Sequence, residues 1–316
     1  MDIQKIKTLG DLKKAGYQPK GIKQELRDNL LTHLKKGTTV FQGIHGYENS
    51  VIPNVERAIL SGHNINFLGL RGQAKTRMAR QMTDLLDEYI PAITGAELND
   101  DPLQPISRQA NDLIAEHGDA TPIHWIHRSE RYFEKLATPD VTVADLIGDV
   151  DPIKAANLKL PYSDERTLHF GMIPRAHRSI FVINELPDLQ ARIQVSLFNI
   201  LQEGDIQIRG FKLRLPLDLQ VVFTANPEDY TNRGSIVTQI LTHYPKTIDT
   251  ARLITQQEAK LTAAQKELVE IPDAAYELIE QISFEARDNE FIDGKSGVSA
   301  RLAISALENL VSTAER

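Results

Sequence analysis

The chain has 316 residues, of which 41% are hydrophobic and 25% charged, with a formal net charge of −7. This composition is typical of a globular protein with room for an α/β core and one smaller domain. The absence of cysteine excludes disulfides, zinc–thiolate sites and a cysteine nucleophile. The negative charge argues against nucleic acid as a partner, because phosphate contacts need clustered Lys and Arg. No apolar run reaches the length of a membrane span, and residues 1–14 are charged without an apolar signal core, so we expect a cytoplasmic protein.

The first half of the chain alternates between helical and extended patterns. Residues 1–40 are expected to form a small helical lead-in, with an amphipathic helix over 21–36. A second helix is predicted at 49–61, where apolar residues recur at helical spacing. The short apolar run at 65–70 is ended by glycine, which predicts a buried parallel strand, and a helix should follow over 76–89. Residues 91–121 are rich in Pro, Asp, Asn and Gly, which predicts a long surface insertion.

Further short apolar strands are expected at 122–126, 179–183 and 219–225. Because helical or irregular segments separate them, we predict an α/β fold, a three-layer αβα domain around a central parallel sheet. A helix is expected over 190–202, and the alternation of apolar and polar residues around Gly210 predicts a hairpin. From about residue 255 the sequence becomes helical, with helices predicted near 255–268, 273–288 and 299–313.

A phosphate-binding pattern follows the strand predicted at 65–70. Residues 69–76 (Gly-Leu-Arg-Gly-Gln-Ala-Lys-Thr) fit G-x-x-x-x-G-K-[ST], except that Ala74 replaces the last glycine. Backbone N–H groups of such a loop point at phosphate oxygens, the Lys75 ammonium pairs with the β- and γ-phosphates, and the Thr76 hydroxyl binds Mg²⁺. We expect Ala74 to be tolerated through a helical rather than a left-handed backbone. The residues expected to bind the phosphates are Gly69, Arg71, Gly72, Gln73, Ala74, Lys75, Thr76 and Arg77.

The strand predicted at 179–183 ends in two polar residues, Asn184 and Glu185. When such a strand faces a P-loop, its first polar residue holds Mg²⁺ through water and the second, a carboxylate, polarises the attacking water. Asn184 accepts hydrogen bonds from metal-bound water but brings no charge, so we expect weaker metal binding. Glu185 remains available as the base. Asn226, just after the strand predicted at 219–225, is placed to hold water near the γ-phosphate. The predicted metal site therefore comprises Thr76, Asn184 through water, and Glu185.

These strand ends, in this order, resemble the AAA+ superfamily of P-loop ATPases. Within it the chain is similar to the helix-2-insert branch, which contains the magnesium chelatase I subunit and the MoxR ATPases. The resemblance spans residues from about 41 to 310 and rests on several stretches beside the P-loop. These are 44–48 (like a nucleotide-base contact), 99–105 (like an acidic chelatase insertion), 170–178 (like the stretch before the acidic strand), 197–208 (like a MoxR segment) and 297–302 (like the start of a sensor-2 helix).

The resemblance implies ATP or ADP with Mg²⁺ as ligands and ATP hydrolysis as the activity. Asn226 takes the role of sensor 1 and Arg301 that of sensor 2, beside Lys75 and Glu185. The implied organisation is an AAA+ core at 41–250 with a helical lid at 251–316, and a ring oligomer, a hexamer, acting on a partner protein with a von Willebrand A domain. Inserts in the core are implied at about 91–121, 141–173 and 205–217, and base contacts at Ile44, His45, Gly46 and Tyr47.

One departure concerns the segment after sensor 1. Relatives carry an Asp-Arg element there that supplies an arginine finger to the neighbouring subunit, whereas here 230–238 passes directly to 239–245. We expect a segment to be missing between Thr238 and Gln239, and we favour its omission from the sequence over a true deletion. In a true deletion, Arg233 and Arg178 are the substitute fingers.

Three classes of function remain open. The first is an ATPase that remodels a partner protein or complex, either a MoxR-like chaperone, a metal-insertion motor or a magnesium chelatase ATPase subunit proper. The second is a nucleotide-binding regulatory or scaffold module with weak hydrolysis, which Asn184, Ala74 and the missing finger favour. The third, an enhancer-dependent transcription activator or DNA helicase, is disfavoured by the absence of a Gly-Ala-Phe-Thr-Gly-Ala loop and of a strongly basic region.

Overall fold

A parallel β-sheet forms the centre of the molecule in the computed structural model, which describes residues 3–162, 164–203, 205–208, 211–227, 237–292 and 298–316. Within these residues the sheet has five strands in the order β11-β1-β10-β7-β4, and each neighbouring pair is parallel. This arrangement confirms the predicted α/β class. The strands are β1 (Asn64–Leu68), β4 (Tyr132–Leu136), β7 (Ser179–Asn184), β10 (Leu219–Ala225) and β11 (Val237–Leu241).

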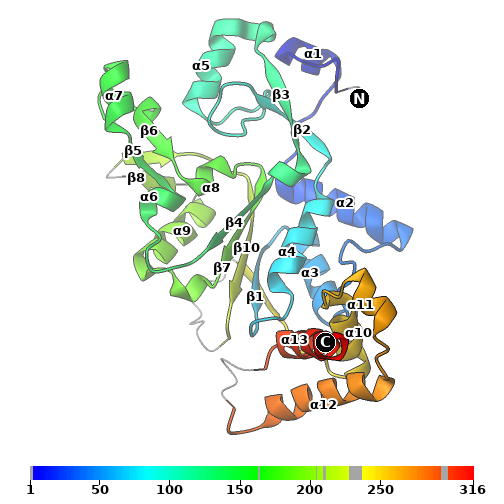
Figure 1. Ribbon diagram of the computed structural model, residues 1–316. Helices are drawn as coiled ribbons and strands as arrows, with labels where there is room; N and C mark the ends of the chain where they lie inside the picture. The colour runs from blue at the N-terminus through cyan, green and yellow to red at the C-terminus, as the bar shows by residue number, and fades with distance from the viewer. Residues whose placement is uncertain (1–2, 163, 204, 209–210, 228–236, 293–297) are drawn as a thin grey trace.

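Helices cover both faces of this sheet (Figure 1), because the inner strands are apolar on both sides. Alternate residues of β7 point to opposite faces, so that Ile180 joins one core cluster and Phe181 the other. The predicted three-layer αβα arrangement is therefore correct. One layer contains α2 (Ile22–Lys36), α3 (Val51–Leu60), α4 (Lys75–Gln81) and the 3₁₀ helix η1 (Met82–Leu85), and the other contains α8 (Met172–Arg175), η5 (Leu186–Asp188) and α9 (Ala191–Glu203).

The predicted strand at 122–126 exists, but it lies outside the central sheet. The strand β3 (Ile123–His127) pairs in an antiparallel manner with β2 (Tyr89–Ile93), and the prediction that it belongs to the core sheet is wrong. The strand beside β7 at the edge of the central sheet is instead β4, which was not predicted from the sequence. The strands β2 and β3 flank the predicted 91–121 insertion, which contains α5 (Arg108–His117) and η2 (Gly118–Ala120), and η3 (Arg128–Glu130) follows β3.

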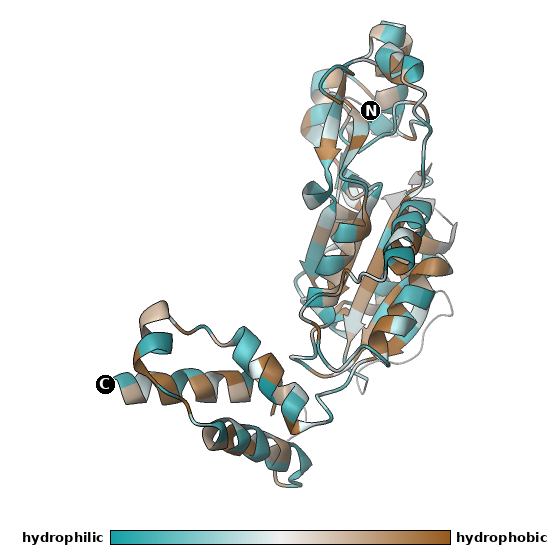
Figure 2. Cartoon of the chain, turned by 90° about the vertical axis from the view of Figure 1, so that its right-hand side faces the viewer, coloured by the Kyte–Doolittle hydropathy of each residue, from teal (hydrophilic) through white to brown (hydrophobic). Residues whose placement is uncertain are grey.

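The N-terminal residues pack on this insertion. The backbone N–H of Leu9 donates to Thr121 O at 2.9 Å, and buried Leu12 packs with Ile6 and Ile123. The helix α1 (Leu9–Lys14) therefore belongs with the insertion, whereas the predicted amphipathic helix α2 packs on the core. Figure 2 shows this N-terminal unit at one end of the molecule and the C-terminal helices at the other, with the core between them.

Two smaller inserts contain antiparallel strand pairs. The segment predicted at 141–173 contains β5 (Gly148–Val150) paired with β6 (Leu168–Phe170), together with α6 (Val143–Leu146), α7 (Pro152–Leu158) and η4 (Glu165–Thr167). The hairpin predicted around Gly210 consists of β8 (Asp205–Ile208) and β9 (Phe211–Arg214). Gly210 itself lies outside the described residues.

The C-terminal part is helical and comprises α10 (Ile248–Glu258), α11 (Ala263–Leu268), α12 (Asp273–Asp288) and α13 (Ala300–Glu315). The helices predicted near 273–288 and 299–313 are present, but the single helix predicted near 255–268 is wrong, because the chain is not helical between Glu258 and Ala263. The buried stripe Ala303, Leu307 and Val311 recurs every four residues along α13 and faces the other lid helices. Among the helices that the structure describes, none is long and apolar enough to cross a bilayer.

The junction between Thr238 and Gln239 lies inside β11. Thr238 pairs with Ile65 and Gln239 with Asn66, and the register runs through the junction without a break. The sheet is complete at this place without added residues, so the expectation of a missing segment at this junction finds no support in the structure.

Candidate functional site

The predicted phosphate loop connects β1 to α4 at the carboxyl end of the sheet. A cavity of about 730 Å³ opens beside it, between the core and the lid, which is a size suited to a small-molecule ligand. Gly69 lies at the back of the loop, where a Cβ atom would overlap the side chains of Thr242 and Gln73. The predicted loop residues that line the cavity are Arg71, Gly72, Gln73, Ala74, Lys75, Thr76 and Arg77.

Ala74 has a left-handed backbone, with φ 55° and ψ 12°. The expectation that its backbone is helical is therefore wrong. The loop keeps the conformation that a glycine would adopt freely, because the next residue, Lys75, begins α4 and the chain must turn sharply before it. A Cβ in this conformation costs about 1–2 kcal/mol.

Replacing Ala74 by glycine is expected to raise the free energy of unfolding by about 1 kcal/mol, because the strain relieved exceeds the entropy that glycine loses. Urea denaturation measures the change. Ala115→Gly in the exposed part of α5 is the matched control, and it should lower stability by about 1 kcal/mol. Equal losses in both variants would contradict the left-handed conformation at Ala74.

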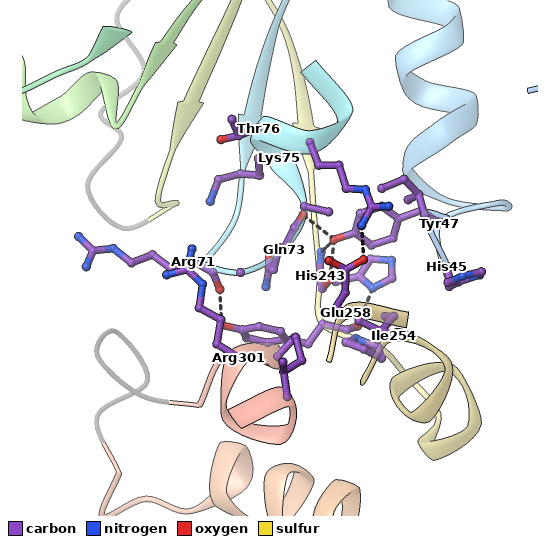
Figure 3. A pocket seen from close by; sticks show the side chains of 18 of the residues that line it. His45, Tyr47, Arg71, Gln73, Lys75, Thr76, His243, Ile254, Glu258 and Arg301 are labelled. Carbon is purple, nitrogen blue, oxygen red and sulfur yellow. Dashed lines mark hydrogen bonds and ion pairs between the residues drawn. The ribbon is translucent and has the colours of Figure 1, made fainter. Parts of the chain in front are cut away.

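Lys75 is buried at the start of α4, and its ammonium points into the loop (Figure 3). Its Nζ donates hydrogen bonds to the backbone oxygens of Gly69 and Leu70, the latter at 2.8 Å. Burial lowers the pKa of the Lys75 ammonium, while the Glu185 carboxylate acts in the opposite direction and Arg71 reinforces the lowering. The cation of the loop and the predicted base both line the same cavity.

The strand ends meet beside the loop through a chain of hydrogen bonds. The hydroxyl of Thr76 donates to Asn184 Oδ1 at 3.2 Å, and that of Thr224 on β10 donates to the same oxygen at 3.1 Å. The backbone N–H of Glu185 donates to Thr224 Oγ1 at 3.1 Å and holds Glu185 in a left-handed conformation, with φ 55°. A non-glycine residue in this region is strained, and such strain is concentrated at functional sites. Thr224 was missed by the sequence analysis, although it lies in a correctly predicted strand.

The predicted metal site fits a hard divalent cation. Thr76, Asn184 and Glu185 all line the cavity, and their side chains carry a hydroxyl, an amide and a carboxylate. Oxygen ligands from one or two carboxylates, with waters and phosphates, are what Mg²⁺ prefers.

The predicted base-contact segment lies at the opposite side of the cavity. Ile44, His45 and Tyr47 line it, and His45 Nε2 is 2.8 Å from Gln257 Oε1 of the lid. The Tyr47 hydroxyl donates to the backbone oxygens of Gln73 and His243, at 3.2 and 2.7 Å. Gly46 has a positive φ of 81° and lies in the turn between His45 and Tyr47, and it is not among the described lining residues.

The lid contributes more of the wall than was predicted. Arg301 lies at the start of α13 and lines the cavity, as predicted, from the side facing Arg71 (Figure 3). Glu258 of α10 forms an ion pair with Arg77, and the Tyr244 hydroxyl donates to Arg71 O at 2.9 Å. The lining residues that the sequence analysis missed, apart from Thr224, are Gly43, Leu136, His243, Tyr244, Pro245, Ile254, Gln257, Glu258, Ala300 and Ile304.

Two further predicted residues of the described chain, Asn226 and Arg178, are not among the residues that line the cavity. Asn226 follows β10 at the correct sheet edge but lies outside the described lining, where Thr224 represents this strand. Arg178 is buried, pairs with Asp101 at 3.1 Å and donates to Pro91 O at 2.7 Å. A finger must reach a neighbouring subunit, so the prediction of Arg178 as a substitute finger is wrong. Arg233 lies outside the described residues.

A family model described as "Sigma-54 interaction domain" matches residues 160–240, from the second insert to β11. The chain resembles AAA+ ATPases, as predicted. Similar solved structures include a complex between subunits BchI and BchD of magnesium chelatase, at 20% identity and a TM-score of 0.44, covering 75% of this chain and 70% of that chain. NtrX from Brucella abortus matches at 11% identity and a TM-score of 0.46, covering 90% of this chain and 55% of that chain, so the chain spans about half of its length.

Proposed function

We propose that the chain binds ATP and ADP with Mg²⁺ in the cavity between the P-loop and the lid, and that it hydrolyses ATP to remodel a partner protein. The observation that carries this proposal is the meeting of Lys75, Thr76 and Glu185 in one cavity lined by the glycine-containing loop. A buried ammonium, a hydroxyl and a carboxylate at the end of a parallel sheet are the groups that phosphoryl transfer needs.

Each group has one role in the proposed reaction. Lys75 stabilises negative charge on the β- and γ-phosphates. Thr76 and, through water, Asn184 would hold Mg²⁺, which would neutralise charge that develops on the phosphates. Glu185 accepts the proton of the attacking water, and Arg301 contacts the phosphates from the lid.

The contacts between the core and the lid would couple ATP hydrolysis to movement of the lid. Arg77, the second residue after the loop lysine, pairs with Glu258 of α10, and Tyr244 bonds the loop backbone at Arg71. A nucleotide that contacts Arg71 and Arg301 together favours one lid position over another, because ligands shift a conformational equilibrium by their differential contacts. The proposed assembly is a ring of copies of this chain, a hexamer, acting on a protein with a von Willebrand A domain.

The family match raises a second candidate partner. The matched model is described as a sigma-54 interaction domain, and residues 160–240 include the hairpin of β8 and β9. Pull-down with a von Willebrand A protein and, in parallel, with a sigma-54 factor separates the two. Capture of the sigma factor alone would overturn the von Willebrand A assignment.

Replacing Lys75 by alanine is expected to weaken ATP and ADP binding about 10- to 100-fold, because hydrogen bonds to charged groups contribute about 1.5–3 kcal/mol. Isothermal titration calorimetry with Mg²⁺ measures the affinity. Lys266→Ala, an exposed lysine of α11, is the matched control and should bind as the wild type does. Wild-type protein without saturable nucleotide binding, or unchanged affinity in Lys75→Ala, would overturn the proposal.

A further inference from the structure

The amide of Asn184 is held by groups from three different elements. Its oxygen accepts from Thr76 of α4 at 3.2 Å and from Thr224 of β10 at 3.1 Å. Its nitrogen donates to Glu134 Oε1 of β4 at 2.6 Å. In Figure 1, β4, β7 and β10 lie side by side, so Glu134 reaches Asn184 from the adjacent strand. No role was assigned to Glu134 by the sequence analysis.

Glu134 determines which way the Asn184 amide faces. An ionised carboxylate has no proton to donate, so only the NH₂ group of Asn184 can face it. The amide oxygen must therefore face Thr76, the proposed magnesium ligand, and Thr224, and it accepts from both hydroxyls. Reversing the amide would place its oxygen 2.6 Å from a carboxylate oxygen and leave both without a donor.

Glu134 also places a negative charge beside the uncharged Asn184 side chain. The carboxylate is one hydrogen bond away from the amide, on the neighbouring strand, and its side chain is about a quarter exposed. Its other oxygen pairs with Arg80 at 2.8 Å, but the Arg80 side chain is 67% exposed, so solvent screens that ion pair. Carboxylates at both positions would repel each other at this distance, which explains why one of the two is an amide.

We propose that Glu134 is a positioning residue for the Mg²⁺–nucleotide complex: it orients the Asn184 amide and places on β4 the carboxylate charge absent from the end of β7. This role rests on the proposed nucleotide binding. It makes Asn184 and Glu134 a matched pair whose functional groups are exchangeable between the two strands.

The first test measures how much Mg²⁺ strengthens ADP binding, by calorimetric titration with Mg²⁺ and again with EDTA. A glutamine at position 134 removes the charge and can face Asn184 with either end of its amide. Glu134→Gln is therefore expected to reduce the ratio of the two affinities about tenfold, with the EDTA affinity unchanged. Glu116→Gln, in the exposed part of α5, is the matched control and should keep the wild-type ratio.

The second test exchanges the two groups. Asn184→Asp alone places two carboxylates together, and it should lower the melting temperature of the protein in EDTA. The double variant Asn184→Asp with Glu134→Gln removes that repulsion, because the glutamine amide introduced on β4 donates to the new carboxylate on β7. It should recover both the melting temperature and the Mg²⁺-dependent affinity ratio that Glu134→Gln loses.

The outcomes separate this role from the proposed function. One outcome is that nucleotide binding depends on Lys75, but the ratio of ADP affinities with Mg²⁺ and with EDTA is the same in Glu134→Gln as in Glu116→Gln. This outcome overturns the role of Glu134 and leaves the proposed function intact. Failure of the exchanged pair to recover the ratio also overturns it, because a merely structural loss would not be reversed by moving the charge. Wild-type protein that binds no ADP overturns the proposed function and this role with it.

Discussion

Replacing Glu185 by glutamine is expected to lower the rate of ATP hydrolysis about 10²- to 10⁴-fold, the range that a positioned general base contributes. Glutamine has nearly the same shape but cannot accept the proton of the attacking water. The bond from the backbone N–H of residue 185 to Thr224 Oγ1 does not involve the side chain, so the local backbone should persist. Phosphate release with saturating Mg²⁺–ATP measures the rate, and ADP affinity should stay within a few-fold of wild type.

The same measurement decides between an ATPase and a regulatory nucleotide-binding module. Glu267→Gln, an exposed carboxylate of α11, is the matched control and should hydrolyse at the wild-type rate. If Glu185→Gln also hydrolysed at that rate, the assignment of Glu185 as base would be lost. If wild-type protein bound ATP through Lys75 without turnover, the regulatory module would replace the ATPase as the proposed function.

The sheet shows where sequence patterns suffice and where they do not. The inner strands β1, β7 and β10 are buried on both faces, so their apolar runs predict them directly. The missed strands β4 and β11 are the two edges of the sheet. Edge strands are partly exposed and tolerate polar residues, such as Glu134 and Lys135 in β4, which conceal the strand pattern. The apolar strand β3 was predicted to lie in the central sheet, where the structure has β4. The spacing of apolar residues indicates that a segment is a strand, but it does not indicate which other strand it pairs with.

A similar limit applies to the site. The groups within the loop and at the ends of inner strands follow from short motifs, because the chemistry fixes their spacing. Glu134 and Glu258 reach the site from an edge strand and from the lid, and no local pattern indicates such contacts over 50 or more residues of chain, as between Glu134 and Asn184. The prediction of a helical backbone at Ala74 was also wrong. A residue type indicates only which conformation it prefers, whereas the closure of the loop imposes the conformation that Ala74 adopts.

A buried ion pair fastens α2 to the sheet and is the feature whose loss should cost the most stability. Arg131 precedes β4 and donates to both carboxylate oxygens of Glu25, at 2.6 and 2.7 Å, with side chains only 1% and 3% exposed. It also donates to Arg178 O through Nε and Nη2. Arg131→Met should lower the free energy of unfolding by about 3–5 kcal/mol, because it leaves the Glu25 carboxylate buried without its cation. Urea denaturation measures this loss.

Two comparisons isolate the cause of that loss. Arg128→Met removes an exposed pair with Asp84 and should cost less than about 1 kcal/mol. The double variant Glu25→Leu with Arg131→Met removes both charges together, so it should recover much of the lost stability. If the double variant were as unstable as Arg131→Met, the penalty would not come from the unpaired carboxylate. It would then come from the Arg178 carbonyl that Arg131 also satisfies, or from the Asp87 N–H that loses Glu25 as its acceptor in the double variant, since an unpaired buried group costs about 1–3 kcal/mol. The ion pair would in that event contribute little to holding α2 on the sheet.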